Sequence, residues 1–306
     1  MQQQTGSNSH FRKTLDQSGT YVADLSADER RITNLRQLTL NSDESGWSWT
    51  GDSKAMILWR RSSSATEQRS SSGELFRQSP DEDTTEVLTA DPDIAGPPRL
   101  SPDGAWVVYR VSSPRPQLMR VPISGGVREP VPNGLLPTTI EDSVRCARSP
   151  ANFCMITERT SDRRQLTFTA LDPVSGRRRE LTRFRLDDQG ASYAADISPD
   201  GTRIAVLNVR TGLIRILSVG GQLLHEFTVR HYLGTMDWAA DGKGLFVCTS
   251  TPHGVALVHV DLQGKADVLW EQEGGLLMWG LPSPDGRRLG IMRAVISANI
   301  WVMQNF

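Results

Sequence analysis

The sequence predicts an all-β fold: a single six-bladed β-propeller built from four-stranded antiparallel blades. The first observation is a recurring Pro-Asp-Gly turn, or a close variant, followed each time by an apolar strand. The second is the spacing of these turns, which lies in the range of propeller blades. The third is that no stretch of the 306 residues keeps the 3.6-residue apolar period of a helix.

The recurring turn defines the repeat. Counted from its aspartate, or from Ala151 in the degenerate copy "ARSPANFCMIT", the copies are 41 to 51 residues apart. Six copies are present, with turns near positions 52, 103, 151, 200, 241 and 285. Aspartate and glycine are the residues that tolerate the backbone angles of a tight hairpin, so we expect each copy to be a hairpin turn.

Each repeat is expected to contain four short strands. The turn is followed by an apolar strand such as "AWVVYRV" and then by an alternating strand such as "PQLMRVPI". A glycine-containing turn such as "ISGG" leads to a third strand, and the segment before the Pro-Asp-Gly turn supplies the remaining one. The apolar faces are predicted to pack against neighbouring blades, including Trp49 and Trp238, which stand three residues before the turn aspartate.

The ring is predicted to close with a strand from the N-terminal region. The last repeat, ending in "ANIWVMQNF", supplies three strands, and an open ring would leave an unpaired edge. We expect Arg30–Leu40 to provide the missing outer strand, with residues 1–18 as a flexible tail and 19–306 as the propeller. The strand-like segment 20–26 has no place in this scheme; it is either an extra edge strand or a sign of more blades upstream.

Composition excludes some function classes. With 34 basic and 35 acidic residues the net charge is −1, which favours neither a nucleic acid nor a membrane surface as partner. No apolar run approaches the ~18 residues of a membrane span, and the N-terminus has no signal-peptide core. As written the chain would be cytoplasmic; as part of a longer membrane-anchored chain it would be periplasmic, so the compartment stays open.

The three cysteines do not form a disulfide framework. Cys146 and Cys154 are spaced so that one small loop between them could be closed by a disulfide. Two reduced thiols are the alternative, since one such pair is weak evidence of an oxidising compartment.

The turn and the strand after it resemble the Pro-Asp variety of WD-like repeat found in TolB-type propellers, from about Gly19 to Phe306. The motifs "RLSPDGAWVVY", "RCARSPANFC", "DWAADGKGLFV" and "SANIWVMQNF" look like the C-terminal propeller of acidobacterial signalling proteins. Proteins of that group attach such a propeller to a serine/threonine kinase or a winged-helix regulator, where it looks like a sensor or interaction module. This sequence contains no kinase or winged-helix motif, so the resemblance implies only the role of the propeller.

A search for catalytic and metal-binding patterns finds none that is specific. The turn aspartates are expected to cap their own turns, about a blade apart and too distant to share a metal. There is no GxSxG motif, and the five histidines lack zinc-site spacing. We therefore expect no catalytic residue, metal or cofactor, and a protein that is not an enzyme. A channel-mouth enzyme of hydrolase or lyase type is the alternative; for it only Asp196 and Asp237 recur in register.

The candidate binding residues are expected on the loops before the inner strands, at one face of the propeller. Aromatic, arginine and carboxylate side chains are typical of a protein-interaction face. The residues are Trp47, Arg99, Arg145, Tyr193, Asp196, Asp237 and Trp279. We predict a monomeric protein-interaction or sensor module in bacterial signalling that binds a protein or peptide. The truncated sensor part of a larger kinase or transcription regulator is a further alternative.

Overall fold

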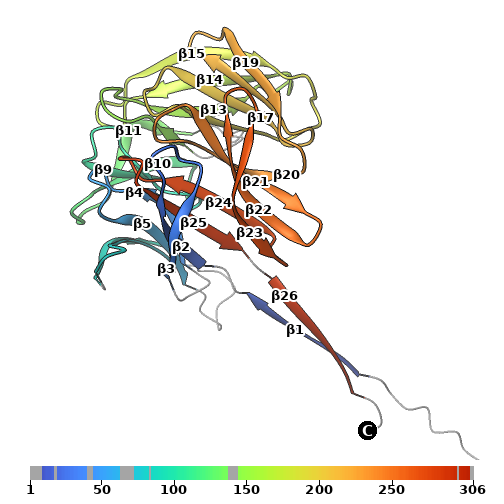
Figure 1. Ribbon diagram of the computed structural model, residues 1–306. Coiled ribbons are helices and arrows are strands. Elements are labelled where there is room, and N and C mark those ends of the chain that lie inside the picture. The colour runs from blue at the N-terminus through green and yellow to red at the C-terminus, as the bar shows by residue number, and fades with distance from the viewer. Residues whose placement is uncertain are drawn as a thin grey trace, which may run out of the picture.

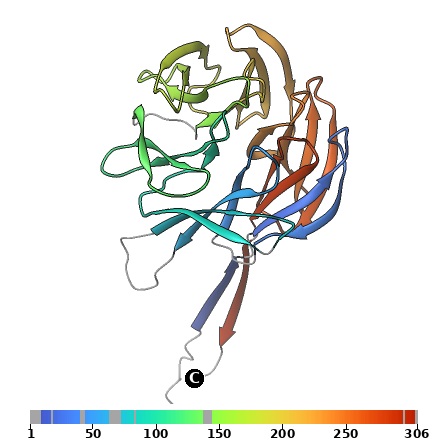
Figure 2. The ribbon, with the colours of Figure 1, turned by 90° about the vertical axis from the view of Figure 1, so that its left-hand side faces the viewer.

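The computed structural model describes residues 9–16, 19–39, 44–62, 72–82, 84–136, 144–294 and 296–303. Six four-stranded antiparallel sheets form a ring (Figures 1 and 2), and residues of all six line a central channel. The described residues contain no helix, and hence none long and apolar enough to cross a membrane. The predicted six-bladed propeller is confirmed.

The first five blades each use four consecutive strands, with the first strand on the channel. Blade 1 is β4 (Glu44–Trp49), β5 (Met56–Ser62), β6 (Ser72–Gln78) and β7 (Thr85–Asp91). Blade 2 is β8 (Arg99–Leu100), β9 (Trp106–Val111), β10 (Gln117–Pro122) and β11 (Glu129–Leu135). Blade 3 is β12 (Arg145–Cys146), β13 (Cys154–Arg159), β14 (Gln165–Leu171) and β15 (Arg178–Arg185).

Blades 4 and 5 follow the same order along the chain. Blade 4 is β16 (Tyr193–Ile197), β17 (Arg203–Asn208), β18 (Leu213–Ser218) and β19 (Leu223–Thr228). Blade 5 is β20 (Tyr232–Trp238), β21 (Gly244–Thr251), β22 (Gly254–Asp261) and β23 (Ala266–Glu273).

Blade 6 closes the ring with two strands from each end of the chain. Its order is β24 (Leu277–Pro282), β25 (Arg288–Ala294), β2 (Gly19–Leu25) and β3 (Ile32–Gln37). The expected outer strand in 30–40 is confirmed as β3, but the expected third strand in "ANIWVMQNF" is wrong. That place is taken by β2, the segment 20–26 that had no role, because β2 pairs with β25 over six residues and is almost wholly buried.

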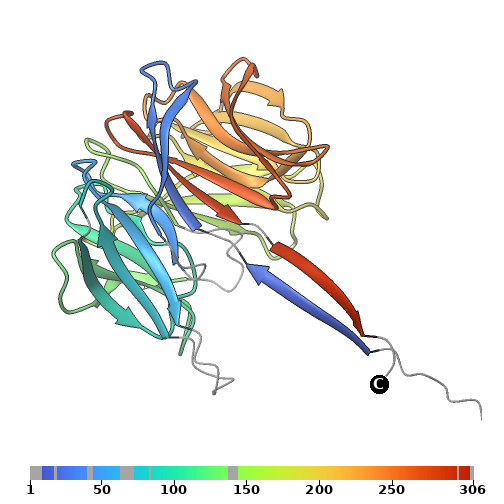
Figure 3. The ribbon, with the colours of Figure 1, turned by 60° about the horizontal axis from the view of Figure 1, so that its bottom comes forward.

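The strand expected in blade 6 instead forms a separate ribbon. β26 (Ile296–Met303) pairs antiparallel with β1 (Ser9–Asp16), and the two project away from the propeller (Figure 3). β1 lies inside the range 1–18; the division into a flexible tail and a propeller over 19–306 stays a prediction.

The Pro-Asp-Gly turns are held by a compact side-chain network, seen clearly in blade 4. The Ser198 hydroxyl donates to Asp200 Oδ1 at 2.5 Å and accepts from the Arg203 N–H at 2.9 Å. Asp200 Oδ1 also accepts from the Thr202 N–H at 3.1 Å. Each turn aspartate caps its own turn in this way, as predicted, at Asp52, Asp103, Asp200, Asp241 and Asp285.

Among the five aspartate-capped turns, that of blade 5 has alanine (Ala239) where the other four have serine or threonine, and a side chain of blade 6 bonds to its backbone. The Glu29 carboxylate accepts from the Ala240 and Asp241 N–H groups at 3.1 and 3.2 Å. Burial raises the pKa of Glu29, although those two N–H groups act to lower it.

The hydrophobic core consists of six clusters among the described residues, each lying between two adjacent blades. The predicted packing of Trp49 and Trp238 is confirmed: they are 3% and 2% exposed. Their indole N–H groups donate to the preceding blade, Trp49 to the Leu281 carbonyl at 2.8 Å and Trp238 to the Asp196 carbonyl at 3.3 Å. Blade–blade contact is therefore where this fold buries its apolar surface.

Candidate functional site

A cavity of about 510 Å³ opens into the central channel at the face that carries the Pro-Asp-Gly turns. All six blades contribute to its lining, which includes the turn residues Ser101–Gly104 and Ala147–Ser149. We call this cavity the channel cup. Its size is that of a binding site for a small molecule or a short chain segment.

One position of every blade lines the channel cup: the penultimate residue of the first strand. In chain order the six residues are Ser48, Arg99, Arg145, Asp196, Asp237 and Leu281. Blades 2 and 3 therefore present arginine to the channel, blades 4 and 5 present aspartate, and blades 6 and 1 present neutral side chains. Arg99 and Asp237 therefore stand on opposite walls of the channel, whereas Arg145 and Asp196 stand on neighbouring blades.

Side chains from blades 2, 3 and 6 meet at Asp237 of blade 5. Its Oδ2 lies 3.2 Å from Arg145 Nη1 and 3.6 Å from Arg99 Nη2. The same oxygen accepts the Trp279 indole N–H at 3.3 Å, and the Arg145 guanidinium lies 5.1 Å from the centre of the Trp279 ring. Because blade 2 stands opposite blade 5 in a ring of six, the Arg99–Asp237 ion pair crosses the channel. Burial raises the pKa of Asp237, although Arg145 acts to lower it.

Asp196 is buried beside this network. Its Oδ1 accepts from the Ile197 N–H at 2.9 Å and its Oδ2 from the Trp238 N–H of blade 5 at 3.2 Å. Burial, and then the charge of Asp237, raises the pKa of Asp196 well above its usual value.

Arg148 extends across the mouth of the channel cup from blade 3. Its Nη1 and Nη2 donate to the Pro284 and Pro282 carbonyls of blade 6, each at 3.4 Å. Burial lowers the pKa of Arg148. Sequence reasoning missed this residue, although a signal was present: Arg148 precedes Ser-Pro in its repeat, where Leu100 and Ile197 stand in others.

Four of the predicted site residues come together in the structure: Arg99, Arg145, Asp237 and Trp279. Asp196 lines the same cavity, but the location differs from the expected loop face. All five residues belong to the inner strands. Arg99, Arg145, Asp196 and Asp237 line the channel cup next to the turns at the strand ends, and Trp279 lies two residues before the lining residue Leu281. The sequence pattern placed the strand starts too late, so strand residues were taken for loop residues.

The two remaining candidates do not join this group. Tyr193 is 4% exposed and packs between blades 3 and 4. Its hydroxyl donates to Asp187 and accepts the Asp188 N–H at 3.0 Å, away from the channel cup. The side chain of Trp47 lies outside what the structure describes.

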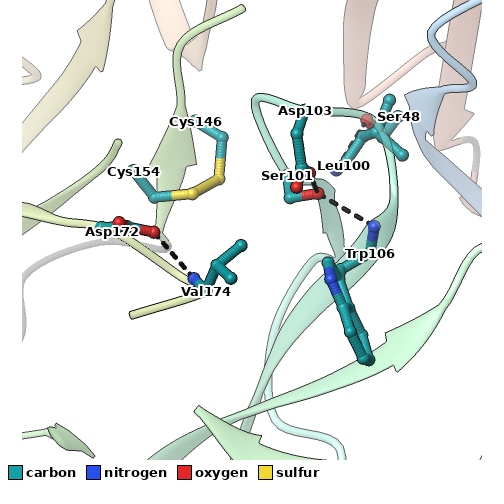
Figure 4. The surroundings of a disulfide bond; sticks show 9 residues. All are labelled: Ser48, Leu100, Ser101, Asp103, Trp106, Cys146, Cys154, Asp172 and Val174. Atoms are coloured by element: carbon teal, nitrogen blue, oxygen red, sulfur yellow. Dashed lines mark hydrogen bonds between the residues drawn. A yellow bond between two sulfur atoms is a disulfide. The ribbon is translucent and has the colours of Figure 1, made fainter. Parts of the chain in front are cut away.

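A disulfide joins Cys146 of β12 to Cys154 of β13, directly opposite each other in the strand pair (Figure 4). At the same place blade 4 pairs Ile197 with Ile204. Cys146 lines the channel cup and follows Arg145 directly, so the covalent link holds the short strand that carries this arginine. In Figure 4 the Ser101–Asp103 turn of blade 2 lies across from the disulfide.

The described residues contain no group of three or more histidine, cysteine, aspartate or glutamate side chains that could hold a metal ion. The charged and aromatic groups that line the channel cup are guanidinium, carboxyl and indole groups, among them those of Arg145, Asp237 and Trp238.

Comparison with known proteins places the fold. No protein-family model and no curated protein matches the chain. Among solved structures, one from Agrobacterium tumefaciens assigned to TolB is similar, with a TM-score of 0.61, 18% identity, and coverage of 90% of this chain and 98% of its own. A structure of a nidogen/laminin complex matches with a TM-score of 0.57, 12% identity, and coverage of 91% and 98%. These likenesses show a propeller fold shared with TolB.

A third structure corrects one expectation. An oligogalacturonate lyase in complex with manganese matches with a TM-score of 0.50, 13% identity, and coverage of 92% of this chain and 77% of its own. The expectation that this chain is not an enzyme is therefore wrong as an inference from its sequence and fold. A chain of similar fold is thus an enzyme, and fold alone does not decide activity, because function resides in the residues of the site.

Proposed function

We propose that this chain is an interaction module that holds a protein or peptide segment in the channel cup, as a sensor in bacterial signalling. The observation that carries the proposal is the ring of six in-register residues, in which Arg99 and Arg145 both reach Asp237 in one cavity. Opposed charges beside Trp279 suit a partner segment that brings both polar and apolar groups.

Two further observations support this proposal. The nidogen/laminin structure is a protein complex with a similar propeller. Motifs of this sequence also resemble those of the C-terminal propellers of acidobacterial signalling proteins, which supports a role as the propeller of a kinase or a winged-helix regulator. We expect the chain to act as a monomer, which the molar mass from light scattering will test.

The test is site-specific photo-crosslinking in native lysate. A photo-reactive amino acid replaces Gly51, which lines the channel cup. A side chain fits there, because a Cβ at this position would lie 3.7 Å from its nearest neighbour, Leu100 Cδ2. The control carries the same probe at Arg179, exposed on the outer strand of blade 3. We expect a discrete protein adduct from position 51 alone, with the crosslink mapping to one partner segment.

A second variant guards against chance capture. Trp279→Ala in the position-51 protein should abolish the adduct, since it removes the indole that packs under the channel arginines. Equal adducts from positions 51 and 179, or an adduct that survives Trp279→Ala, would contradict the proposal.

A further inference from the structure

The turn of blade 3 departs from the repeat and places an arginine at the mouth of the channel cup. Its hairpin closes with the Ala147 N–H on the Phe153 carbonyl, one residue longer than in blade 2, where the Ser101 N–H bonds to the Trp106 carbonyl. The backbone of Arg148 is anchored to the next blade, because its N–H donates to the Pro199 carbonyl at 2.8 Å. The start of this side chain is therefore held in place, and its guanidinium lies over the channel.

The guanidinium of Arg148 has only weak neutral partners. Its two hydrogen bonds, to the Pro282 and Pro284 carbonyls, are both 3.4 Å long, beyond the usual range for N–H···O bonds. In the part of the chain that the structure describes, no carboxylate oxygen lies within 4.0 Å of it, whereas Arg99 and Arg145 both pair with Asp237.

The carboxylates that act on Arg148 from farther away are engaged elsewhere. They are Asp237, Glu29, Asp196 and Asp285. Asp237 pairs with two arginines, Glu29 and Asp196 accept backbone N–H groups, and Asp285 caps its own turn. Burial lowers the pKa of Arg148 because it disfavours the charged guanidinium. An anion that enters the channel cup would stabilise this charge. A guanidinium can exchange two weak carbonyl bonds for a bidentate pair with a carboxylate, which is much stronger.

The shape of the channel indicates which end of a ligand enters. The Arg99–Asp237 pair and the contact of Arg145 with the Trp279 ring cross the channel, so a chain cannot pass straight through at that level. A chain end is the part of a polypeptide that fits such a cup. The mouth is lined by Pro102, Pro199, Pro282 and Pro284, apolar surface suited to the residues that precede a terminus.

We propose that Arg148 is the carboxylate-binding residue of the channel cup and that it takes the free C-terminal carboxylate of a partner peptide. This inference rests on the proposed function and adds the chemical group by which the partner is recognised.

The test uses defined probes. They are N-acetyl-Ala-Ala-Pro-Ala with a free carboxylate, the same peptide amidated, an amidated N-acetyl-Ala-Asp-Ala, and D-galacturonate. Binding is followed by the NMR shift of the Trp279 indole N–H and by calorimetry. We expect the free acid to bind about tenfold more tightly than its amide, because only the free acid can form a charge-assisted pair with Arg148.

Variants assign that preference to Arg148. Arg148→Gln should make the free acid and the amide bind equally, and Arg148→Lys should keep part of the preference because a single charge remains. Arg179→Gln, an exposed arginine of the same blade, is the matched control and should leave the preference unchanged.

Each other outcome overturns the proposal. Equal binding of acid and amide to the unaltered protein, no saturable shift with any probe, or a preference that survives Arg148→Gln removes Arg148 as the carboxylate site. Tighter binding of the aspartyl peptide assigns an acidic side chain instead of a C-terminus, and tighter binding of galacturonate assigns a sugar acid.

The two proposals fail separately. Crosslinks from position 51 to an internal partner segment, with no preference for the free acid, would keep the interaction module and refute the C-terminal carboxylate. A free-acid preference that depends on Arg148, without any protein crosslink, would keep the carboxylate site and refute the protein partner.

Discussion

Blades 3 and 4 are neighbours with the same strand order, yet their first hairpins are stabilised differently. In blade 4 the turn is self-contained: Ser198, Asp200 and the N–H groups of the following residues satisfy one another. In blade 3 the aspartate is missing and a disulfide links the two strands. The turn backbone is bonded to both neighbours instead, Ser149 N–H to the Pro102 carbonyl and Arg148 N–H to the Pro199 carbonyl.

The difference shows where this repeat carries chemistry. The regular turn uses its polar side chains to satisfy its own backbone, so none is left for a ligand. The irregular turn is held by a covalent bond and by its neighbours, which leaves the Arg148 side chain to reach across the channel. The turn of blade 3 also packs closely against the turn of blade 4. Gly201 of blade 4 makes this packing possible, because a Cβ at that position would lie 2.8 Å from the Cβ of Ala151.

The largest expected effect is at the contact between blades 4 and 5. Trp238 ends its first strand at the position that Cys146 holds in blade 3, and it is 2% exposed. Trp238→Ala should lower the free energy of unfolding by about 3–5 kcal/mol, because it opens a cavity between two blades. Urea denaturation measures this. Trp106→Ala, at a half-buried site, should cost clearly less, and equal losses would mean that inter-blade burial is not decisive.

Removal of the disulfide should be the next largest effect. The Cys146→Ala/Cys154→Ala protein should lose about 2–3 kcal/mol of unfolding free energy, from the entropy of an open short loop in the unfolded chain. A reductant should destabilise the unaltered protein by a similar amount and leave the double variant unchanged. If reductant shifts both proteins equally, the covalent link is not what holds the first hairpin of blade 3.

A serine exchange compares the two turns directly. Ser198→Ala removes a fully buried hydroxyl that serves two partners and should cost about 1–2 kcal/mol. Ser149→Ala removes an exposed hydroxyl from the turn of blade 3 and should change stability by less than about 0.5 kcal/mol. The two values come from matched denaturation curves, and a reversed order would refute the contrast between the turns.

The smallest effect is the pH dependence that Asp200 contributes to the turn of blade 4. Burial acts to raise the pKa of Asp200, but the hydrogen bonds from Ser198 and Thr202 hold it below its usual value. Its stabilising contribution is therefore present above the unfolded pKa of about 4 and is lost as pH falls through the lower folded value. Asp200→Asn should abolish this step.

Amide hydrogen exchange locates the step. The protection factor of the Thr202 N–H, which donates to Asp200, should fall in acid, whereas that of the Ala151 N–H, which donates to the Arg148 carbonyl, should not. Parallel losses at both amides would show a global effect instead.

The sequence by itself determined the repeated unit of this protein. The Pro-Asp-Gly turns, the spacing between them and the apolar strands are local properties of the sequence. Each copy therefore predicts the same turn and the same strands. The packing of Trp49 and Trp238 could be predicted for the same reason: the same position is apolar in several copies, and a shared apolar position faces a neighbouring blade.

Tertiary structure alone decided which strands close the ring and which side chains meet in the channel. Both the β2 and the β26 segments have strand patterns, and only pairing with β25 assigns β2 to blade 6, because a pattern does not specify its partner. Arg148 and the Pro282 carbonyl are 134 residues apart in the chain. They meet because blades 3 and 6 stand opposite in a ring of six, a relation that depends on the closure of the whole propeller.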